Sequence, residues 1–259
     1  MTQDILTHVE AGVMTVTLNR VARKNSINTA MYAALADAFA QARDDAAVRV
    51  VVLQGHETIF SAGNDIADFQ AQPAVPTVPQ AERPVFRFMS GLATFPKPVI
   101  ASVCGPAVGI GTTMLFHCDL VYAGDNAAFS MPFVNLGICP EFASTLLVPQ
   151  MFGYHRAAEA LLLGEPFMAE AALEAGLVNR VLPPTEANGY AAGIARKLAA
   201  KPSTSLAASK RLMKGEQQAQ VLKKIEEEGA IFTRMLSEPA AREAFGAFMD
   251  KRKPDFSKL

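Results

Sequence analysis

The 259-residue sequence has no tryptophan, three cysteines and four histidines. The cysteines are an odd number without C-x-x-C spacing, which fits a reducing compartment better than a disulfide framework. No two histidines stand three or four residues apart, so no metal site is predicted. No apolar run reaches the ~18 residues of a membrane span, and the first ten residues include acids and no signal-peptide core. We therefore expect a cytoplasmic protein that does not enter a membrane.

An excess of charge of one sign is also missing. The 24 Lys and Arg residues nearly balance the 25 Asp and Glu residues, and no basic stripe suggests nucleic acid as a partner. A chain of this length can bury a core without disulfides or metals. The last three residues, 257–259, spell S-K-L, which is a peroxisomal address in eukaryotes and leaves that compartment as the alternative location.

The N-terminal half alternates between strand and helix patterns. Two β-rich runs, 5–9 and 13–18, flank Gly12 and predict a hairpin. Asn28 is placed to cap a helix, and a continuous apolar strand follows at 48–53. The alternation continues with a helix at 82–93, a strand at 99–103, a helix at 111–117 and a strand at 120–123. This order predicts a layered α/β fold.

The C-terminal third is dominated by helical periodicity. Helices are predicted at 157–163, 186–199, 206–213, 217–236 and 240–251, with a strand-like run at 178–182. Residues 70–80 contain three prolines and predict a loop, which either covers a binding site or is a solvated connector.

Several common catalytic motifs are incomplete. A hydrolase elbow needs G-x-S-x-G, but Ile59 occupies the first glycine position before Ser61. The glycines at 109 and 111 begin like a dinucleotide fingerprint, but Met114 stands in place of the third glycine. These glycines must therefore serve another purpose.

Two turns follow predicted strands and expose main-chain N–H groups. Residues 60–66 come shortly after the strand at 48–53, and residues 105–111 follow the strand at 99–103. Such turns either join strand to helix and do no more, or direct two N–H groups at one oxygen. In a dry site, each such donor is worth about 3 kcal/mol to a developing oxyanion.

The two turns resemble the signature of the enoyl-CoA hydratase/isomerase family, also called the crotonase family. The family motifs are A-G-x-D-[IL] and K-P-[VT]-I-A-x-[VI]-x-G-x-A-x-G; this sequence has A-G-N-D-I and K-P-V-I-A-S-V-C-G-P-A-V-G. Further matches are spread over most of the chain: L-N-R-V-A-R-K-N-S-I-N near residue 20, C-D-L-V-Y-A at 118, F-S-M-P-F-V-N-L-G at 129, A-L-L-L-G-E-P-F at 160 and F-M-D-K-R-K-P-D-F near the end.

The resemblance implies a crotonase-like spiral of ββα repeats in residues 1–195, followed by a helical C-terminal region in 196–259 that drives trimerisation. The expected assembly is a homotrimer or a hexamer made from two trimers. The implied ligand is an acyl-CoA, whose CoA is part of the substrate, and no other cofactor is expected. By motif position, the amides of Ala62 and Ile110 would hold the thioester oxygen.

The reaction depends on the acids. The family's hydratases use two glutamates, and this sequence has Thr113 and Phe133 at those positions, so hydration is disfavoured. The segment C-P-E-F, which contains Glu141, is similar to the S-P-E-G segment of the family's Δ3,Δ2-enoyl-CoA isomerases. Glu141 is thus the expected proton shuttle, or else an acid in the first turn of a helix. The alternatives are a hydratase using Glu141 and a non-catalytic acyl-CoA-binding member.

The remaining binding residues follow from the resemblance alone. Arg23 and Lys24 lie where the family's basic residues meet the CoA phosphates, and Ser26 lies where small groups line the ligand. The glycine turns and their neighbours complete the expected substrate-binding set: Gly63, Asp65, Ile66, Gly109, Thr113 and Phe133. Asp65 is also placed to cap the helix that follows it.

Overall fold

The computed structural model describes residues 4–70, 78–257 and 259. The chain opens with the antiparallel hairpin β1 (Ile5–Glu10) and β2 (Val13–Leu18), as predicted. Gly12 has a φ of +81°, the left-handed region that favours glycine in a tight turn. Helix α1 (Thr29–Asp44) begins after Asn28, whose side chain accepts a hydrogen bond from the amide of Met31 and confirms the predicted cap.

The main sheet has the order β1-β2-β3-β4-β6-β9, and all pairings after the hairpin are parallel. The strands that follow the hairpin are β3 (Val50–Gln54), β4 (Val99–Val103), β6 (Leu120–Gly124) and β9 (Arg180–Leu182). The valine-rich strands β3 and β4 are buried on both faces, which explains their continuous apolar sequences.

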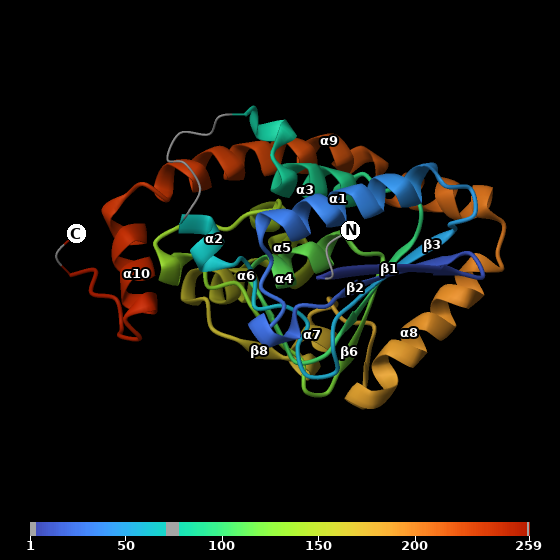
Figure 1. Cartoon of the computed structure of the whole chain (residues 1–259), viewed down its shortest axis with the longest axis horizontal. Helices are drawn as coiled ribbons and strands as arrows, with labels where there is room; N and C mark the ends of the chain where they lie inside the picture. Colours follow the sequence, from blue (N-terminus) through green and yellow to red (C-terminus); the bar gives the residue numbers. More distant parts are fainter. Residues whose placement is uncertain (1–3, 71–77, 258) are drawn as a thin grey trace.

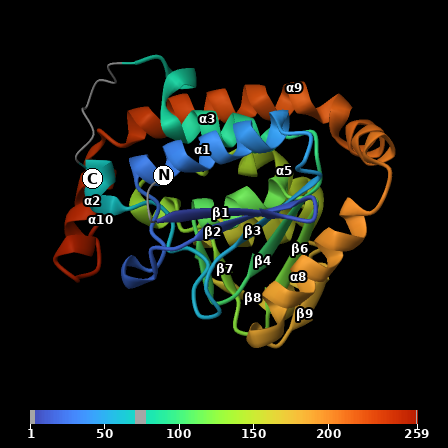
Figure 2. The same ribbon diagram turned by 45° about the vertical axis from the view of Figure 1, so that its right-hand side comes forward.

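Helices cover both faces of this sheet (Figure 2). Val50 and Val52 pack against α8 (Pro184–Ala199), whose buried face consists of alanines. Val51 and Leu53 point the other way, into the core that includes α1 and α3 (Pro84–Ala93). The period of two along β3 therefore divides its side chains between two apolar layers.

A second, smaller sheet has the order β5-β7-β8. Its strands are β5 (Pro106–Val108), β7 (Ala128–Ser130) and β8 (Phe167–Met168). A parallel bridge between Ser61 and Ala107 continues this sheet towards the N-terminus, and another joins Ile27 to Asn64. Along the sequence, a strand of the main sheet is followed by a short segment in the second layer, and this order is repeated. The repetition gives the chain its spiral course. The short strands were not predicted, because two or three residues carry no periodicity.

The C-terminal region consists of α9 (Ser203–Met235) and α10 (Pro239–Met249), with α9 running above α3 and α1 in Figure 1. The two helices predicted at 206–213 and 217–236 are one helix, so that prediction was wrong. The interruption at Gly215 costs about 1 kcal/mol relative to alanine, and contacts on both sides of it outweigh that cost. Lys210 pairs with Asp119 before the glycine, and Val221 is buried after it.

The remaining helices are short. They are α2 (Ile66–Gln70), α4 (Ile110–Thr113), α5 (Ser144–Phe152), α6 (Tyr154–Ala158) and α7 (Ala169–Glu174), with 3-10 turns at Val21–Arg23, Gln80–Glu82, Met114–His117 and Val134–Leu136 and a π-helical turn at Glu159–Leu163. The helices predicted at 111–117 and 157–163 each change type midway. Most of the proline-rich loop predicted at 70–80 lies outside the described residues, as does Lys258 of the S-K-L tail. Among the described helices, none combines the length and apolar character needed to cross a bilayer.

Candidate active site

The two predicted turns lie side by side. The amide of Ser61 donates to the carbonyl of Pro106 at 3.0 Å, and the amide of Val108 donates back to the carbonyl of Ser61 at 2.9 Å. Gly63 has a φ of +85°, and a Cβ at this position would lie 2.7 Å from the carbonyl oxygen of Val108. Glycine is therefore required here for both its backbone conformation and the close approach of the second turn.

One of the two predicted oxyanion donors is wrong. The amide of Ala62 already donates to the carbonyl of Lys24 at 2.9 Å, so it is not available to a ligand. Within the described part of the chain, the amides of Asn64 and Ile110 have no acceptor. Ile110 is the first residue of α4 and has no partner inside its helix. Asn64 and Ile110 each lie three residues beyond the bridged pair, Ser61 and Ala107, so they occupy equivalent places in adjacent turns.

Glu141 lies in the loop before α5, with only 6% of its surface exposed. Its Oε1 accepts a hydrogen bond from the hydroxyl of Thr113 at 2.6 Å. Burial raises the pKa of Glu141 to about 8. The hydrogen bond from Thr113 works to lower this pKa, and the nearby charge of Glu228 works to raise it. Helix α5 begins only at Ser144, so Glu141 is not an acid in the first turn of a helix. Thr113 stands one turn after Ile110 and connects the acid to the amide pair.

The backbone after Glu141 is left-handed at two residues, Phe142 and Ala143, with φ values of 62° and 56°. Such values are costly for residues other than glycine. His117 stacks on the ring of Phe142 at 3.9 Å, and its Nε2 lies 2.8 Å from the Phe142 carbonyl oxygen. Burial lowers the pKa of His117 to about 3, so the ring is neutral and donates from Nε2 to the carbonyl. Side chains thus hold the turn in its strained form.

Tyr32 is hydrogen-bonded to the side chain of Asn64 and lies near the charge of Glu141. Its hydroxyl donates to Oδ1 of Asn64. Burial raises the pKa of Tyr32, and the charge of Glu141 raises it further. The described residues therefore bring Asn64, Tyr32 and Glu141 into one region.

Aromatic rings form the apolar side of this region. The ring of Phe133 would lie 3.9 Å from a Cβ on Gly109, and it packs edge-on against Phe232 of α9. Phe142 in turn packs against Phe88. Phe133 therefore presents an apolar surface beside the second turn.

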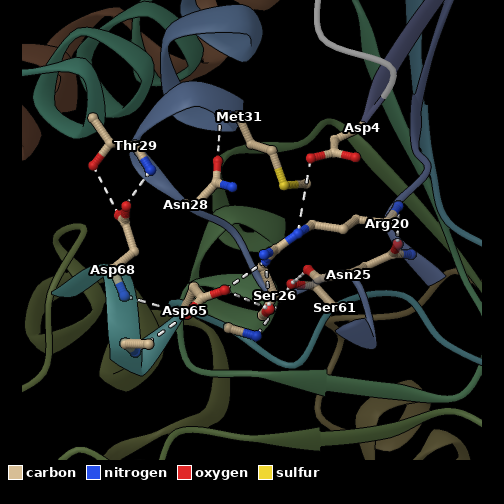
Figure 3. A network of polar contacts seen from close by, with 12 residues as sticks. Asp4, Arg20, Asn25, Ser26, Asn28, Thr29, Met31, Ser61, Asp65 and Asp68 are labelled. Atoms are coloured by element: carbon tan, nitrogen blue, oxygen red, sulfur yellow. Dashed lines mark hydrogen bonds and ion pairs between the residues drawn. The ribbon is translucent and has the colours of Figure 1, made fainter. Parts of the chain in front are cut away.

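Arg20 ties the preceding loop to the first turn (Figure 3). Its Nη1 donates to Oδ2 of Asp65 at 2.6 Å and to the hydroxyl of Ser26 at 3.0 Å. The other oxygen of Asp65 accepts the amides of Ala67 and Asp68, which confirms that Asp65 caps α2. Partial burial works to raise the pKa of Asp65, but the hydrogen bonds and charge of Arg20 lower it overall. Asp65 and Ser26 therefore act first as supports of the turn.

The other predicted binding residues lie around the hydrogen-bonded group of Arg20, Ser26 and Asp65. Arg23 and Lys24 are exposed, and the carbonyl of Lys24 touches the first turn through the Ala62 amide. Ile66 begins α2 and is partly buried. The structure thus brings residues 23–26 and 61–66 together.

Sequence reasoning missed five residues of the site: Arg20, Tyr32, Asn64, His117 and Glu228. Asn64 was visible as the variable position of the A-G-N-D-I motif. Glu228 had a detectable signal too, because it lies on the apolar face of α9 with Val221, Ile225 and Phe232. The remaining three depend on contacts between residues distant in sequence.

Comparisons with known proteins agree with this geometry. Residues 8–258 match the family model described as enoyl-CoA hydratase/isomerase. The 1,2-epoxyphenylacetyl-CoA isomerase of Escherichia coli is 36% identical over 99% of both chains. Enoyl-CoA delta isomerase 2 of Rattus norvegicus is 35% identical over 96% of this chain and 64% of the rat protein, and a further bacterial relative is named as a hydratase.

The solved structure of OdaA from Pseudomonas aeruginosa superposes with a TM-score of 0.92 and 46% identity, covering 96% of this chain and 99% of that one. The predicted crotonase-like fold is thereby confirmed. With a family model that spans nearly the whole sequence, the chain belongs to the enoyl-CoA hydratase/isomerase family.

Proposed function

We propose that this enzyme isomerises 3-enoyl-CoA esters to 2-enoyl-CoA esters. The observation that carries the proposal is the buried carboxyl of Glu141, which is joined through Thr113 to the helix turn that begins with the free amide of Ile110. The two positions at which the family's hydratases carry glutamates are Thr113 and Phe133 here. The names of several relatives, which include enoyl-CoA delta isomerases, support the same reaction.

The reaction needs one base and one oxyanion site. The thioester oxygen would accept hydrogen bonds from the amides of Asn64 and Ile110. The Glu141 carboxylate removes a proton from C2, and the electron pair moves towards the thioester oxygen to form a dienolate. The Glu141 carboxylic acid then returns the proton to C4, so the double bond moves from C3–C4 to C2–C3. All atoms of the substrate are retained, and no co-reactant is consumed.

The surroundings of Glu141 favour proton transfer over hydration. The Thr113 hydroxyl donates to the carboxyl and holds its orientation, but a threonine is not a base at neutral pH. Phe133 is buried beside Gly109, at a place where a hydratase would need to hold a water molecule. Arg23 and Lys24, both exposed, are the proposed partners of the CoA phosphates, and CoA enters only as part of the substrate.

We also propose that the chain assembles as a homotrimer, alone or paired into a hexamer. Leu212, Met213, Phe248 and Met249, all in the C-terminal helices, are each more than half exposed. Val221, Ile225 and Phe245 of the same helices are buried in the chain's own core and are not part of this surface.

A spectrophotometric comparison of two substrates tests the reaction. We expect 3-hexenoyl-CoA to be converted to the conjugated 2-enoyl ester, which absorbs where the 3-enoyl ester does not. Crotonyl-CoA, offered as a hydratase substrate, should lose its absorbance much more slowly. Faster hydration of crotonyl-CoA would replace the isomerase by the hydratase alternative, and turnover of neither ester would favour a non-catalytic acyl-CoA-binding role.

A further inference from the structure

Helix α9 carries three consecutive glutamates, Glu226, Glu227 and Glu228, which differ sharply in their surroundings. The first two are exposed, and the third has 4% of its surface exposed. Helical geometry places Glu228 on the buried face of α9 with Val221, Ile225 and Phe232. A carboxyl on an otherwise apolar face is costly unless it is satisfied by donors.

Glu228 is satisfied by the loop that carries Glu141. Its Oε2 accepts the amide of Ala143 at 2.6 Å, and its Oε1 accepts the amide of Thr145 at 3.0 Å together with the Thr145 hydroxyl. Two main-chain donors and one hydroxyl therefore surround a single buried carboxyl. Glu141, by comparison, has one hydroxyl donor. Because donors stabilise the ionised form, Glu228 should lose its proton before Glu141 does.

The Ala143 amide belongs to the left-handed turn that follows Glu141. Glu228 of α9 accepts a hydrogen bond from this turn, and His117 donates to the neighbouring carbonyl of Phe142. The direction in which Glu141 leaves the backbone is therefore determined by contacts from two separate elements.

We propose that Glu228 is a positioning residue for this reaction: it holds the turn that aims Glu141, and its negative charge strengthens Glu141 as a base. The inference rests on the proposed function. No motif of the family quoted above includes this position.

The other titratable groups near Glu141 and Glu228 are mostly neutral, so few other charges affect the pKa values of these two carboxyls. Burial raises the pKa of Tyr32 from α1 and raises that of Cys139, in the same loop, to about 11, so both are neutral near pH 7. His117 is neutral as well. Lys224, one turn before Glu228, favours the ionised form of Glu228. Burial raises the pKa of Glu228 to about 7, and the nearby charge of Glu228 raises that of Glu141.

The test is a direct titration of the buried carboxyl groups, followed by infrared difference spectroscopy and assigned with the Glu141→Gln variant. In Glu228→Gln, we expect the pKa of Glu141 to fall by roughly half a unit or more, because a like charge has been removed. The acidic limb of the kcat/KM profile should shift to lower pH by the same amount. Glu226→Gln, on the exposed face of the same helix, is the matched control and should titrate like the wild type.

Glu228→Asp separates charge from reach. It keeps the carboxylate but shortens the side chain, so the pKa of Glu141 should stay near its wild-type value while kcat falls several-fold. A purely structural role would instead leave the pH profile unchanged in every variant that folds. The inference is overturned if Glu228→Gln titrates like the wild type, or if Glu228→Asp shifts the profile as far as Glu228→Gln does.

The order of titration in the wild type gives a second measurement if Glu228→Gln does not fold, because the charge of Glu228 acts on Glu141 only when Glu228 ionises first. The Glu141→Gln variant identifies the Glu228 signal, and a Glu228 that titrates after Glu141 in the wild type would overturn the inference. The titration needs no turnover, so its result is separate from that of the proposed function. A wild type that titrates as expected but does not isomerise 3-hexenoyl-CoA would refute the function alone.

Discussion

Main-chain and side-chain atoms have different tasks at the residue scale. The proposed oxyanion donors are amides of Asn64 and Ile110, whose side chains point to other partners, including the Tyr32 hydroxyl. The proton would be carried by the Glu141 side chain, which is buried with one hydrogen-bond donor. A substitution at 64 or 110 therefore acts mainly when it removes the N–H, whereas any loss of basicity at 141 affects the chemistry directly.

Replacing Glu141 by glutamine keeps its size and most of its hydrogen bonding but removes the base. We expect isomerase turnover to fall at least ~100-fold, with binding of the CoA ester nearly unchanged. Steady-state kinetics and calorimetric binding of a saturated acyl-CoA measure the two effects. Wild-type turnover in the glutamine variant would show that Glu141 is not the proton carrier.

Proline at position 64 removes one proposed donor, whereas alanine keeps the amide and loses only the side chain. Asn64→Pro should therefore lower kcat roughly 100-fold or more, and Asn64→Ala should have a mild effect. Circular dichroism of both variants provides the control for folding. Equal activities would place the oxyanion donor elsewhere. Ala62→Pro, by contrast, breaks the hydrogen bond to Lys24 and should lower the melting temperature.

The raised pKa of Glu141 also affects stability. In the folded protein the pKa is about 8, against an ordinary value of 4.5, so the folded state binds its proton more tightly. The stabilisation is fully present below about pH 4.5 and is lost as the pH rises through about 8. Urea unfolding at several pH values should show a free energy of unfolding that declines over this range, with a smaller decline in Glu141→Gln. Equal slopes for both proteins would contradict the raised pKa.

At the scale of elements, α9 connects the C-terminal region to the site. Its first half is fixed by Lys210, whose Nζ lies 2.6 Å from Oδ2 of Asp119 and donates to the carbonyl of Lys97. Its second half carries Glu228 to the loop that holds Glu141. A single helix therefore combines an anchor on the main sheet with a contact to the acid's loop.

Lys210→Met should lower the free energy of unfolding by about 2 kcal/mol or more, because it leaves the mostly buried Asp119 with a weaker partner. Lys214 remains at 3.3 Å but is more exposed. Urea denaturation gives the difference, and Lys223→Met, at an exposed position of the same helix, is the control. If both variants unfold at the same urea concentration, the buried ion pair does not anchor α9.

The long, strongly patterned elements could be predicted from the sequence, because their apolar residues repeat with a clear period. The hairpin, α1 and its Asn28 cap, and the buried strands β3 and β4 are examples. Motif resemblance located both glycine turns, but it could not tell that the Ala62 amide is occupied by Lys24, since that contact joins separate parts of the chain. For Glu228, the sequence shows an acid on the apolar face of α9, but it could not identify the donors of that acid, which lie more than eighty residues away in sequence.

At the scale of the whole molecule, the sheets and their helices form one spiral, and both C-terminal helices carry exposed apolar residues: Leu212 and Met213 in the first third of α9, and Phe248 and Met249 at the end of α10. If these residues form the proposed interface, light scattering should give three or six times the chain mass of 27.7 kDa. Leu212→Glu, which places a charge on this surface, should shift the distribution towards smaller species. A wild-type mass of one chain would refute the proposed assembly.

The spiral has a consequence for how this scaffold tolerates change. Asn64 and Ile110 occupy matching places in neighbouring turns, so their separation follows from the strand-to-strand spacing of about 4.8 Å, a property of the polypeptide itself. Almost any point substitution keeps that spacing unchanged, whereas an insertion or deletion in either turn would displace one amide donor relative to the other. Laboratory evolution of a new activity on this chain should therefore accumulate exchanges at positions such as 113, 133 and 141 while keeping the lengths of both turns constant.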